Sequence, residues 1–491
     1  MMTYIYKLKM KVLHTYLIGT IIILSVLPVG CKKFVEIPSP ATSLVSSNVY
    51  NNNTAPAVMN GIYERMMQSA TNFSSGTVSI SVLAGLSSDE LTNYSTTLNL
   101  IQAYKNEVNE NNVPFWTEMY QYIYTSNAVI AGLNSPASTV TAALKQQLIG
   151  EAEFIRAFCH FYLTNIFGDV PLIVTTDYQT NSVAIRVPQS QVYSQVIADL
   201  KDAEIKLNSN FVGPDGLTVS TERTRPNKWA AAALLARAYL YTKDYTDAIA
   251  QATLVINNNT ANIKLEPNLN NVFLKNSNEA IWQLQPVVPG YDAFDGNIFI
   301  LTTPPGGSSP SPVALSTNLT NSFENGDNRF ANWVGSYPSN GLTYYYPYKY
   351  KVKGGPSNTP LTEYLMVLRI AEQYLIRAEA EANGSSGGQG AVADLNTIRN
   401  RAGLPNYTGA TDQASLLTVI LHERQVELFT EWGHRWFDLK RTNIVNTIMP
   451  PSPGGNVCAE KGGTWNSDWE LYPIPLTEIE KDSKLIQNPG Y

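Results

Sequence analysis

The segment from residue 227 to residue 256 constrains the fold of this chain more than any other stretch. It reads NKWAAAALLARAYLYTKDYTDAIAQATLVI, with large and small residues at helical spacing, among them Leu235, Ala236, Tyr239 and Ala248. Two antiparallel helices pack closely only where a small side chain such as alanine stands at the crossing point. The spacing therefore predicts two helices joined by a short turn, packed against each other as a hairpin.

A second pair of helices is predicted towards the carboxyl end. Apolar and small residues recur there by threes and fours, first at Leu368, Ala371, Leu375, Ala378 and Ala382, and after a Gly/Ser linker at Ala391, Leu395, Ile398 and Ala402. Both pairs are typical of tetratricopeptide-like hairpins. Further helical patterns begin near Ala55, at residues 114–133 and 141–167, and near Gln191. We therefore expect a mostly α fold whose helical scaffold occupies mainly residues 55–266 and 362–441.

Residues 267–361 have a different character and are predicted to form a loop-rich insertion with small β elements. The segment is rich in proline and glycine, and GLTYYYPYKYKVKGG reads as a strand. Long loops inside a helical protein are usually functional, so Tyr291, Phe294 and residues 344–346 are candidate ligand contacts. The alternative is that these aromatic residues pack the loops onto the helices. Residues 84–112 show no clean period, and we expect them to form loops carried on helices.

Residues 416–441, LLTVILHERQVELFTEWGHRWFDLKR, open as an amphipathic helix that is expected to run to Trp432 and end at Gly433. Arg424 falls inside the apolar stripe, and Glu427 and Glu431 are its expected counter-ions. The acids and histidines could also form an acid/base pair or a metal site. Because their spacing matches no metal-binding signature, the pattern favours a buried ion-pair network that fixes how the helix docks.

The composition excludes some classes of ligand. The net charge is −6, and neither lysine nor arginine is clustered, which argues against binding of nucleic acid. Only 15% of the residues are charged, whereas the chain contains 28 Tyr and 8 Trp. Such a composition favours a neutral polar ligand.

The amino terminus resembles a lipoprotein signal peptide covering residues 1–30. Three lysines precede the apolar run YLIGTIIILSVLPVG, which is shorter than the roughly 20 residues that a membrane span needs. Cys31 follows a small residue at the end of this run, so we expect it to be lipidated and to become the mature amino terminus. The alternative is cleavage elsewhere, with Cys31 as a free thiol. Cys159 is expected to act as a small apolar core residue, and three cysteines make no disulfide scaffold.

Taken in order, the motifs resemble the RagB/SusD family of outer-membrane nutrient-binding lipoproteins from Bacteroidetes-type bacteria. The resemblance rests on Cys31 with its short leader, GEAEFIRAFCHFYLTNIFGDVPL at 150–172, NKWAAAALLARAYLY at 227–241, LSTNLTNSFENGDNRF at 315–330, RIAEQYLIRAEAEAN at 369–383, LNTIRNRAGL at 395–404, ERQVELFTEWGHRWFDLKR at 423–441 and LYPIPLTEIEKDSKLIQNPGY at the end. It runs nearly from end to end of the chain.

The resemblance implies a single SusD-like domain, residues 31–491, built from tetratricopeptide-like hairpins with irregular loops. It implies a protein of the outer membrane, facing the cell exterior, that captures a glycan or peptide and passes it to a SusC-like TonB-dependent transporter. No catalytic residue, cofactor or resident metal ion follows from it. The ligand surface is expected in the variable loops 86–112 and 285–312, with Asn93, Tyr94, Tyr291 and Phe294 as the binding residues.

Two other functions stay open from the sequence. The chain could be a tetratricopeptide scaffold that binds protein partners in its concave groove, in which case the loop aromatic residues would be dispensable. It could also be a glycoside hydrolase, which needs two carboxylates facing one pocket at a defined separation. Asp292 and Asp295 are the acids nearest to the loop aromatic residues, although two neighbouring acids in a loop are common by chance.

Overall fold

The computed structural model describes residues 49–69, 72–258, 260–307, 309–384, 388–451 and 456–491. These residues fall into one unit of tertiary contacts. The predicted signal peptide and Cys31 lie outside the described residues. None of the helices in the described part of the chain is long and apolar enough to cross a membrane.

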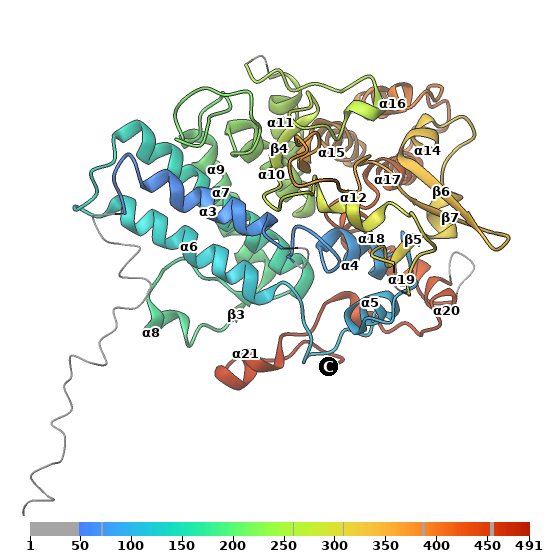
Figure 1. Ribbon diagram of the computed structural model, residues 1–491, viewed down its shortest axis with the longest axis horizontal. Helices are drawn as coiled ribbons and strands as arrows, with labels where there is room; N and C mark the ends of the chain where they lie inside the picture. Colours follow the sequence, from blue (N-terminus) through green and yellow to red (C-terminus); the bar gives the residue numbers. More distant parts are fainter. Residues whose placement is uncertain (1–48, 70–71, 259, 308, 385–387, 452–455) are drawn as a thin grey trace, which may run out of the picture. The chain divides into compact units, whose positions relative to one another are not determined.

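Helices dominate the structure, which confirms the predicted fold class (Figure 1). The longer helices are α3 (Ala55–Met67), α6 (Trp116–Asn134), α7 (Ala142–Phe167), α9 (Gln189–Lys206), α10 (Lys228–Tyr241), α11 (Tyr245–Ile256), α15 (Ile370–Asn383), α16 (Gln389–Arg401) and α17 (Gln413–Leu428). The shorter ones are α4 (Ile80–Ser87), α5 (Leu98–Lys105), α8 (Tyr178–Asn181), α12 (Phe294–Phe299), α13 (Thr317–Thr320), α14 (Asn328–Trp333), α18 (His434–Arg441), α19 (Val445–Ile448), α20 (Val457–Glu460) and α21 (Leu476–Lys481).

The hairpin of α10 and α11 forms as the sequence predicts. Asn227 caps α10, because its side-chain oxygen accepts hydrogen bonds from the backbone N–H groups of Trp229 and Ala230, both at 3.1 Å. Every residue from Trp229 to Leu240 is buried. The alanine-rich helix can therefore be packed on all sides, with α9, α11 and α15 among its neighbours.

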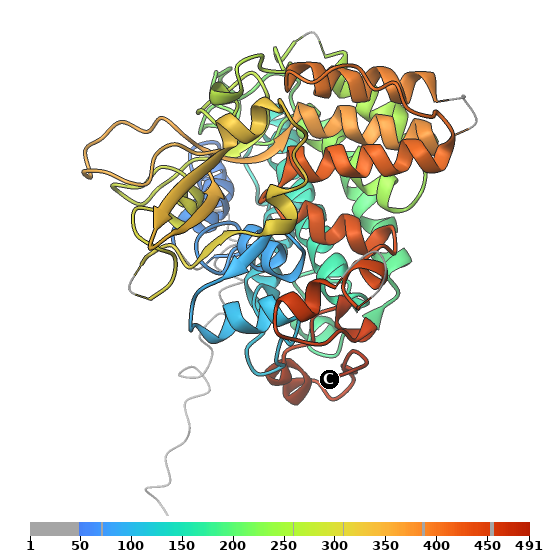
Figure 2. The ribbon, with the colours of Figure 1, turned by 90° about the vertical axis from the view of Figure 1, so that its right-hand side faces the viewer.

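The helices form a continuous stack in which each one contacts the next. Contacts run from α6 to α7, α9, α10, α11 and α15, and α15 in turn touches α16 and α17. Figure 2 shows the last helices of this series, coloured orange to red, lying side by side, with the β6–β7 hairpin at the opposite edge of the view. The β6–β7 hairpin therefore lies away from α15, α16 and α17 in this view.

Strands are short and form four two-stranded antiparallel sheets among the described residues. The pairs are β1 (Leu91–Asn93) with β5 (Val313–Leu315), β2 (Val170–Pro171) with β3 (Arg186–Val187), β4 (Ala280–Leu284) with β8 (Leu365–Arg369), and β6 (Val334–Ser339) with β7 (Leu342–Pro347). The β4–β8 pair joins the two ends of the predicted loop-rich insertion. Its formation places Leu368 in a strand, whereas the sequence pattern predicted a helical position.

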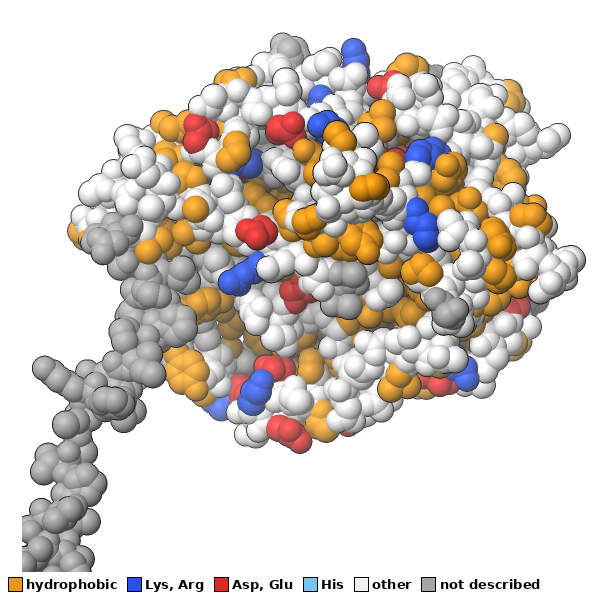
Figure 3. Space-filling model, in the orientation of Figure 1, with side chains coloured by type: hydrophobic (Ala, Val, Ile, Leu, Met, Phe, Trp, Pro, Cys, Tyr) orange, Lys and Arg blue, Asp and Glu red, His pale blue; other side chains and the backbone are white. Residues whose placement is uncertain are grey.

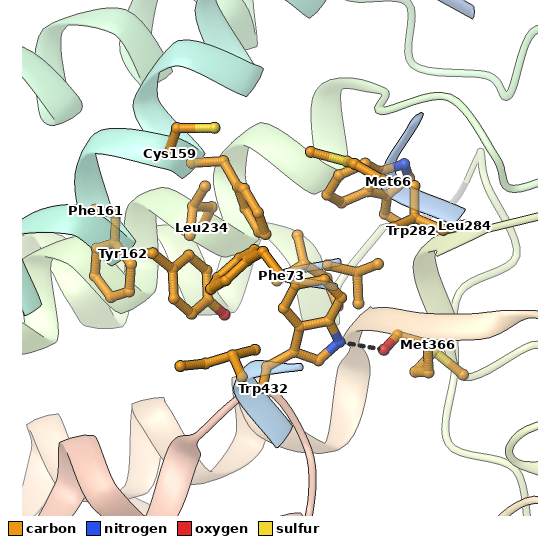
Figure 4. Packing of buried hydrophobic residues seen from close by; sticks show 14 of the residues in the cluster. Met66, Phe73, Cys159, Phe161, Tyr162, Leu234, Trp282, Leu284, Met366 and Trp432 are labelled. Atoms are coloured by element: carbon orange, nitrogen blue, oxygen red, sulfur yellow. Dashed lines mark hydrogen bonds between the residues drawn. The ribbon is translucent and has the colours of Figure 1, made fainter. Parts of the chain in front are cut away.

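The core is centred on aromatic side chains from distant parts of the chain (Figure 4). The ring of Phe73 lies 5.1 Å from that of Tyr162 and 5.9 Å from that of Trp432. The Trp432 indole N–H donates a 2.6 Å hydrogen bond to the Met366 carbonyl oxygen. Cys159 is buried in the same core, which confirms its predicted role as a small apolar residue.

The prediction that one helix runs from residue 416 to Trp432 is wrong. Helix α17 ends at Leu428, and Gly433 is the N-cap of α18 instead of a helix end. Between the two helices, Thr430 and Trp432 adopt left-handed backbone conformations with φ of 54° and 47°. Such conformations persist only where surrounding contacts impose them. Here the Trp432 N–H donates to the Ser81 hydroxyl at 3.1 Å, and the indole is buried beside Phe73.

The stretch before α6 also contains more helix than the sequence indicated. Helices α4 and α5 flank β1, whereas we expected residues 84–112 to form loops carried on helices. Helix α5 has only eight residues and buries Leu100 and Ala103, which are too few positions for a helical period to be recognised in the sequence.

Candidate functional site

Tyr94 and Tyr344, which are 250 positions apart in the sequence, lie edge to face on the surface. Their ring centroids are 5.5 Å apart, with an angle of 82° between the ring planes. Tyr94 is 41% exposed, and Tyr344 is half-buried. The structure thus brings together one residue from each of two loop regions that the sequence singled out. An exposed aromatic pair of this kind offers flat apolar faces next to phenolic hydroxyl groups.

Backbone pairing positions Tyr94. It follows β1, which pairs with β5, and its N–H donates to the Pro312 carbonyl oxygen at 3.0 Å. The loop that leads to β5 passes very close to Tyr94 at Gly306, where φ is +80°. A Cβ atom at Gly306 would lie 2.1 Å from the Tyr94 carbonyl oxygen, so only glycine fits there.

The β6–β7 hairpin presents alternate tyrosines to opposite faces. Tyr345 packs inward, with its ring 5.7 Å from that of Phe330. Tyr344 lies on the other face, and its cross-strand partner is Tyr337. The sequence analysis missed Tyr337. The signal that could have found it is the Asn-Gly dipeptide at 340–341, which adopts φ of 52° and 78° and joins the two strands as a two-residue turn.

The rings of Tyr291 and Phe294, the second predicted pair, stack against each other. The ring centroids are 5.2 Å apart, and the planes are inclined by 28°. Tyr291 is half-buried, whereas Phe294 is 3% exposed and belongs to the main core. Phe294 therefore supports the Tyr291 ring from beneath and has almost no surface of its own to offer. Within the described part of the chain, no ring contact joins this pair to the Tyr94–Tyr344 pair.

Asn93 shapes the backbone beside Tyr94. Its side-chain oxygen accepts from the Ser95 N–H at 3.0 Å, and its amide nitrogen donates to the Ser95 carbonyl oxygen at 3.0 Å. Both ends of the amide are thus used in a local turn directly after β1. The geometry assigns Asn93 a positioning role for the Tyr94 segment.

Asp292 and Asp295, the two acids considered for a hydrolase, are both engaged in holding the fold together or buried in it. Asp292 accepts three hydrogen bonds on one carboxylate oxygen, from the Thr362 N–H and hydroxyl and from the Glu363 N–H, at 2.8 to 2.9 Å. Asp295 is 4% exposed, and burial, with a smaller effect of Glu431, raises its pKa to about 8. Asp292 therefore anchors the chain at residues 362–363, and the burial of Asp295 favours its neutral form.

The acids of α17 and of the turn after it form a buried ion-pair network, as the sequence analysis favoured. Glu427 accepts from Arg369 at 2.6 Å and from Arg329 at 3.0 Å, and it also bonds Arg401. Glu431 accepts from Arg369 at 2.7 Å and also bonds the buried Lys349. The network links α17 to β8, α14 and α16, and its charged groups neutralise one another instead of facing a ligand.

The predicted partners of Arg424 are wrong. Its Nε donates to Asp438 at 2.7 Å and lies 3.9 Å from Glu379, whereas Glu427 and Glu431 bond other cations. The break between α17 and α18 explains the difference. The chain reverses after Leu428, and α18 brings Asp438 back alongside Arg424.

Three groups are close enough together to ligate a metal ion. The ligand atoms of Glu324, His422 and Glu423 lie within 4.8 Å of one another. Both carboxylates already form ion pairs with Arg399, and the distance from Arg399 to Glu324 is 3.0 Å. The His422 Nε2 lies 2.7 Å from the Ser322 carbonyl oxygen. The arrangement therefore fits an ion-pair cluster better than a cation site, which would have to displace Arg399.

The face in Figure 3 carries few charged side chains among many neutral polar and apolar ones. Exposed apolar residues on or near the loop elements include Tyr94, Val287 and Leu342, which are 41%, 40% and 60% exposed. A surface of this kind suits a neutral ligand that is held by ring contacts and hydrogen bonds.

Comparison of the sequence with protein families gives two matches. Residues 335–491 match the family described as "SusD family", and residues 45–240 match the family described as "Starch-binding associating with outer membrane". The chain is 29% identical over 426 residues to SusD-like protein P2 of Formosa agariphila, which covers 77% of this chain and 80% of that protein.

Solved structures share the fold. A laminarin-binding SusD-like protein superimposes with a TM-score of 0.70 and 23% identity, covering 90% of this chain and all of the other. Surface glycan-binding protein A from Bacteroides uniformis gives a TM-score of 0.71 and 21% identity, covering 88% and 98% of the two chains. At these identities the superpositions show a common fold of helical hairpins and small strands.

Proposed function

The chain belongs to the SusD/RagB family, and from that premise we propose that it is a non-catalytic lipoprotein of the outer membrane that binds an oligosaccharide. The observation that carries this proposal is the exposed Tyr94–Tyr344 pair with Tyr337 beside it on the hairpin. Flat aromatic faces stack on the apolar faces of sugar rings, while phenolic hydroxyl groups exchange hydrogen bonds with sugar hydroxyl groups. Tyr291, supported by Phe294, is a further contact in the same proposal.

The class of ligand is supported by the chemistry of the surface and by the proteins that resemble this one. One of the two matching families is described as starch-binding, and two solved proteins of the same fold are a laminarin-binding protein and a surface glycan-binding protein. The scarcity of charged side chains on the face in Figure 3 agrees with a neutral glycan. A peptide ligand, the alternative from the sequence, would have to find its hydrogen-bond partners on the same neutral surface.

Binding of neutral oligosaccharides to the purified protein tests the proposal. Laminarihexaose, maltohexaose and xylohexaose serve as probes in isothermal titration calorimetry. With a probe that binds, Tyr94→Ala should raise Kd roughly tenfold, which corresponds to about 1.4 kcal/mol. Tyr94→Phe should change Kd less, because it keeps the ring.

A matched control comes from a helix outside the loop region. Ile205 is 83% exposed on α9, so Ile205→Ala removes exposed apolar surface without removing a ring. We expect unchanged affinity for Ile205→Ala. If Tyr94→Ala and Tyr291→Ala both bind as tightly as the unmodified protein, the assignment of the site is wrong.

We also propose that Cys31 carries the lipid anchor, that residues 1–30 are removed, and that the mature protein faces the exterior and delivers its ligand to a SusC-like TonB-dependent transporter. The support is the lipobox-like sequence and the description of the matching family as associating with the outer membrane. Cys31→Ser should move the protein out of the membrane fraction. Co-purification with a transporter from solubilised outer membranes tests the partner, and protease treatment of whole cells tests the exposed face.

One observation favours the scaffold alternative. A groove of 540 Å³ lies between the α10–α11 turn, α15, α17 and the end of α18, lined in part by Tyr245, Asn383 and Leu417. If the protein works by binding a protein partner there, Leu417→Asp should abolish capture of that partner, whereas Tyr94→Ala should leave it unchanged. The oligosaccharide titration separates the two functions.

A further inference from the structure

A second pocket is lined by elements that carry none of the loop tyrosines. It encloses 430 Å³, which is within the range of small-ligand pockets. Its walls come from the start of α6, from the connection between β2 and β3 that contains α8, and from α21 near the carboxyl end. Figure 1 shows α8 and α21 at the lower left and bottom of the view, whereas β6 and β7 lie at the right.

One wall of this pocket is rigid and aromatic. The Trp116 ring, at the start of α6, is 5.0 Å from the Tyr120 ring and 5.1 Å from the Phe167 ring, and Trp116 is 4% exposed. The Tyr120 hydroxyl donates to the Pro171 carbonyl oxygen at 2.8 Å, which joins α6 to β2. The core therefore holds these two rings in place before any ligand arrives.

Another part of the lining is a large ring that is mostly exposed to solvent. Tyr178, the first residue of α8, is 79% exposed, the most exposed aromatic side chain among the described residues. Val174, Val183 and Ile185, on the same connection between β2 and β3, are also exposed, at 44%, 48% and 58%. Exposed apolar area on this scale is unfavourable in water unless a ligand covers it.

Amide, hydroxyl and carboxylate groups also line the pocket. Asn181 and Ser182 follow Tyr178, and Glu478 and Asp482 stand on and just after α21. The Asn181 amide nitrogen donates to the Thr175 carbonyl oxygen at 2.8 Å, which fixes the orientation of this amide. Amide and carboxylate oxygens accept hydrogen bonds from hydroxyl groups, so the polar part of the pocket suits a ligand that is rich in hydroxyls.

The charges of the pocket restrict the ligand further. Glu478 and Lys481 form an ion pair at 2.8 Å, and Asp482 adds one more negative charge. The side chains of the pocket thus have a net charge of −1. An anionic ligand would be repelled, and a neutral one would not.

We propose that this pocket, which is lined by Trp116 and Tyr178 and bordered by Asn181, Glu478 and Asp482, is a second subsite for one or two units of a neutral saccharide. The inference rests on the proposed function in that it assigns a second contact for the same class of ligand. A long glycan held at both places would dissociate more slowly than one held at the loop tyrosines alone.

Hydrogen–deuterium exchange of the purified protein tests the proposal, because it localises binding along the chain. The probes are maltohexaose, laminarihexaose and xylohexaose, with an oligogalacturonate of the same length as an anionic comparison. We expect a neutral probe to slow exchange in peptides covering residues 171–186 and 476–486. Tyr178→Ala should raise the probe concentration for half-maximal protection at least tenfold, whereas Tyr94→Ala should leave it unchanged.

Ile205→Ala is the matched control, since Ile205 is 83% exposed on α9 and is not part of the pocket. Tyr178 is preferred to Trp116 as the test position because its ring does not belong to the core. The pocket is not a saccharide site if none of the neutral probes protects these peptides, or if protection survives Tyr178→Ala. Protection by the oligogalacturonate would overturn the requirement for a neutral ligand. Failure of the loop site appears separately, as an absence of Tyr94-dependent protection in residues 92–97 and 303–312.

Discussion

Glu427 is shared by three arginines, and replacing it with glutamine tests whether the buried ion network holds α17 in place. Its carboxylate accepts from Arg369 at 2.6 Å and from Arg329 at 3.0 Å and also bonds Arg401, and its own side chain is fully buried. Burial alone would raise the pKa of Glu427, but the charges of Arg401, Arg369 and Arg329 outweigh burial and hold the pKa below the ordinary value of 4.5.

The expected loss of stability follows from the burial of these partners. Glutamine keeps the shape but removes one negative charge from the centre of three buried cations. Removing one member of a buried ion pair costs about 3–5 kcal/mol, because the remaining charges stay buried without compensation. Unfolding entropy of about 2.1 cal/mol/K per residue, over roughly 440 residues, gives about 0.9 kcal/mol/K. We therefore expect Glu427→Gln to lower Tm by about 3–5 °C.

Differential scanning calorimetry at pH 7 measures this change, and Asp202→Asn is the control. Asp202 pairs with Lys206 at the surface, where its side chain is 51% exposed, so its loss should cost less than about 1 kcal/mol. Because the folded-state pKa of Glu427 is lowered, its contribution is present above about pH 4.5 and is lost as the pH falls. The difference in Tm between the unmodified protein and Glu427→Gln should therefore become smaller below pH 4.5. Equal effects of Glu427→Gln and Asp202→Asn at pH 7 would refute the reasoning.

Two further predictions concern the loop region. Gly306→Ala should cost about 1–3 kcal/mol more than Gly307→Ala in thermal unfolding and should raise the oligosaccharide Kd. Both glycines have positive φ, but only at Gly306 would the new Cβ meet the Tyr94 carbonyl oxygen; equal effects would contradict the steric argument. As the pH rises from 5 to 8, the free energy of unfolding of Asp295→Asn should increase relative to that of the unmodified protein, by up to about 1.4 kcal/mol per pH unit. Burial raises the folded-state pKa of Asp295 to about 8, so the unmodified protein loses stability as its unfolded state ionises; a Tm difference that does not change with pH would show that Asp295 is already ionised.

The local sequence pattern was sufficient to predict the long helices, because the spacing of apolar residues that indicates a helix is repeated at every turn. The spacing of Leu235, Ala236 and Ala248 predicted the α10–α11 hairpin, and the pattern of residues 141–167 predicted α7 almost to the residue. The pattern failed for α5, which buries two residues, and for the end of α17. Apolar periodicity continued past Leu428, although tertiary contacts of Trp432 reverse the chain there.

The candidate site was predictable in kind but not in arrangement. Aromatic residues in long loops identified Tyr94, Tyr291 and Phe294, yet the sequence did not distinguish an exposed ring from a buried one. Tyr94 is 41% exposed, and Phe294 is 3% exposed. Burial of a loop residue depends on which segment covers it, and such contacts join residues far apart in the chain.

The sequence by itself determined the helical hairpins, the burial of Cys159 and the presence of charges that must neutralise one another inside the protein. Only the tertiary structure decided that Asp438 pairs with Arg424, that Glu427 serves three arginines, and that Tyr344 stands against Tyr94. Helix formation is encoded by residues three and four apart, so it can be read locally. The pairing of charges and rings depends on where the chain returns after each loop, and that is set by the packing of the whole core.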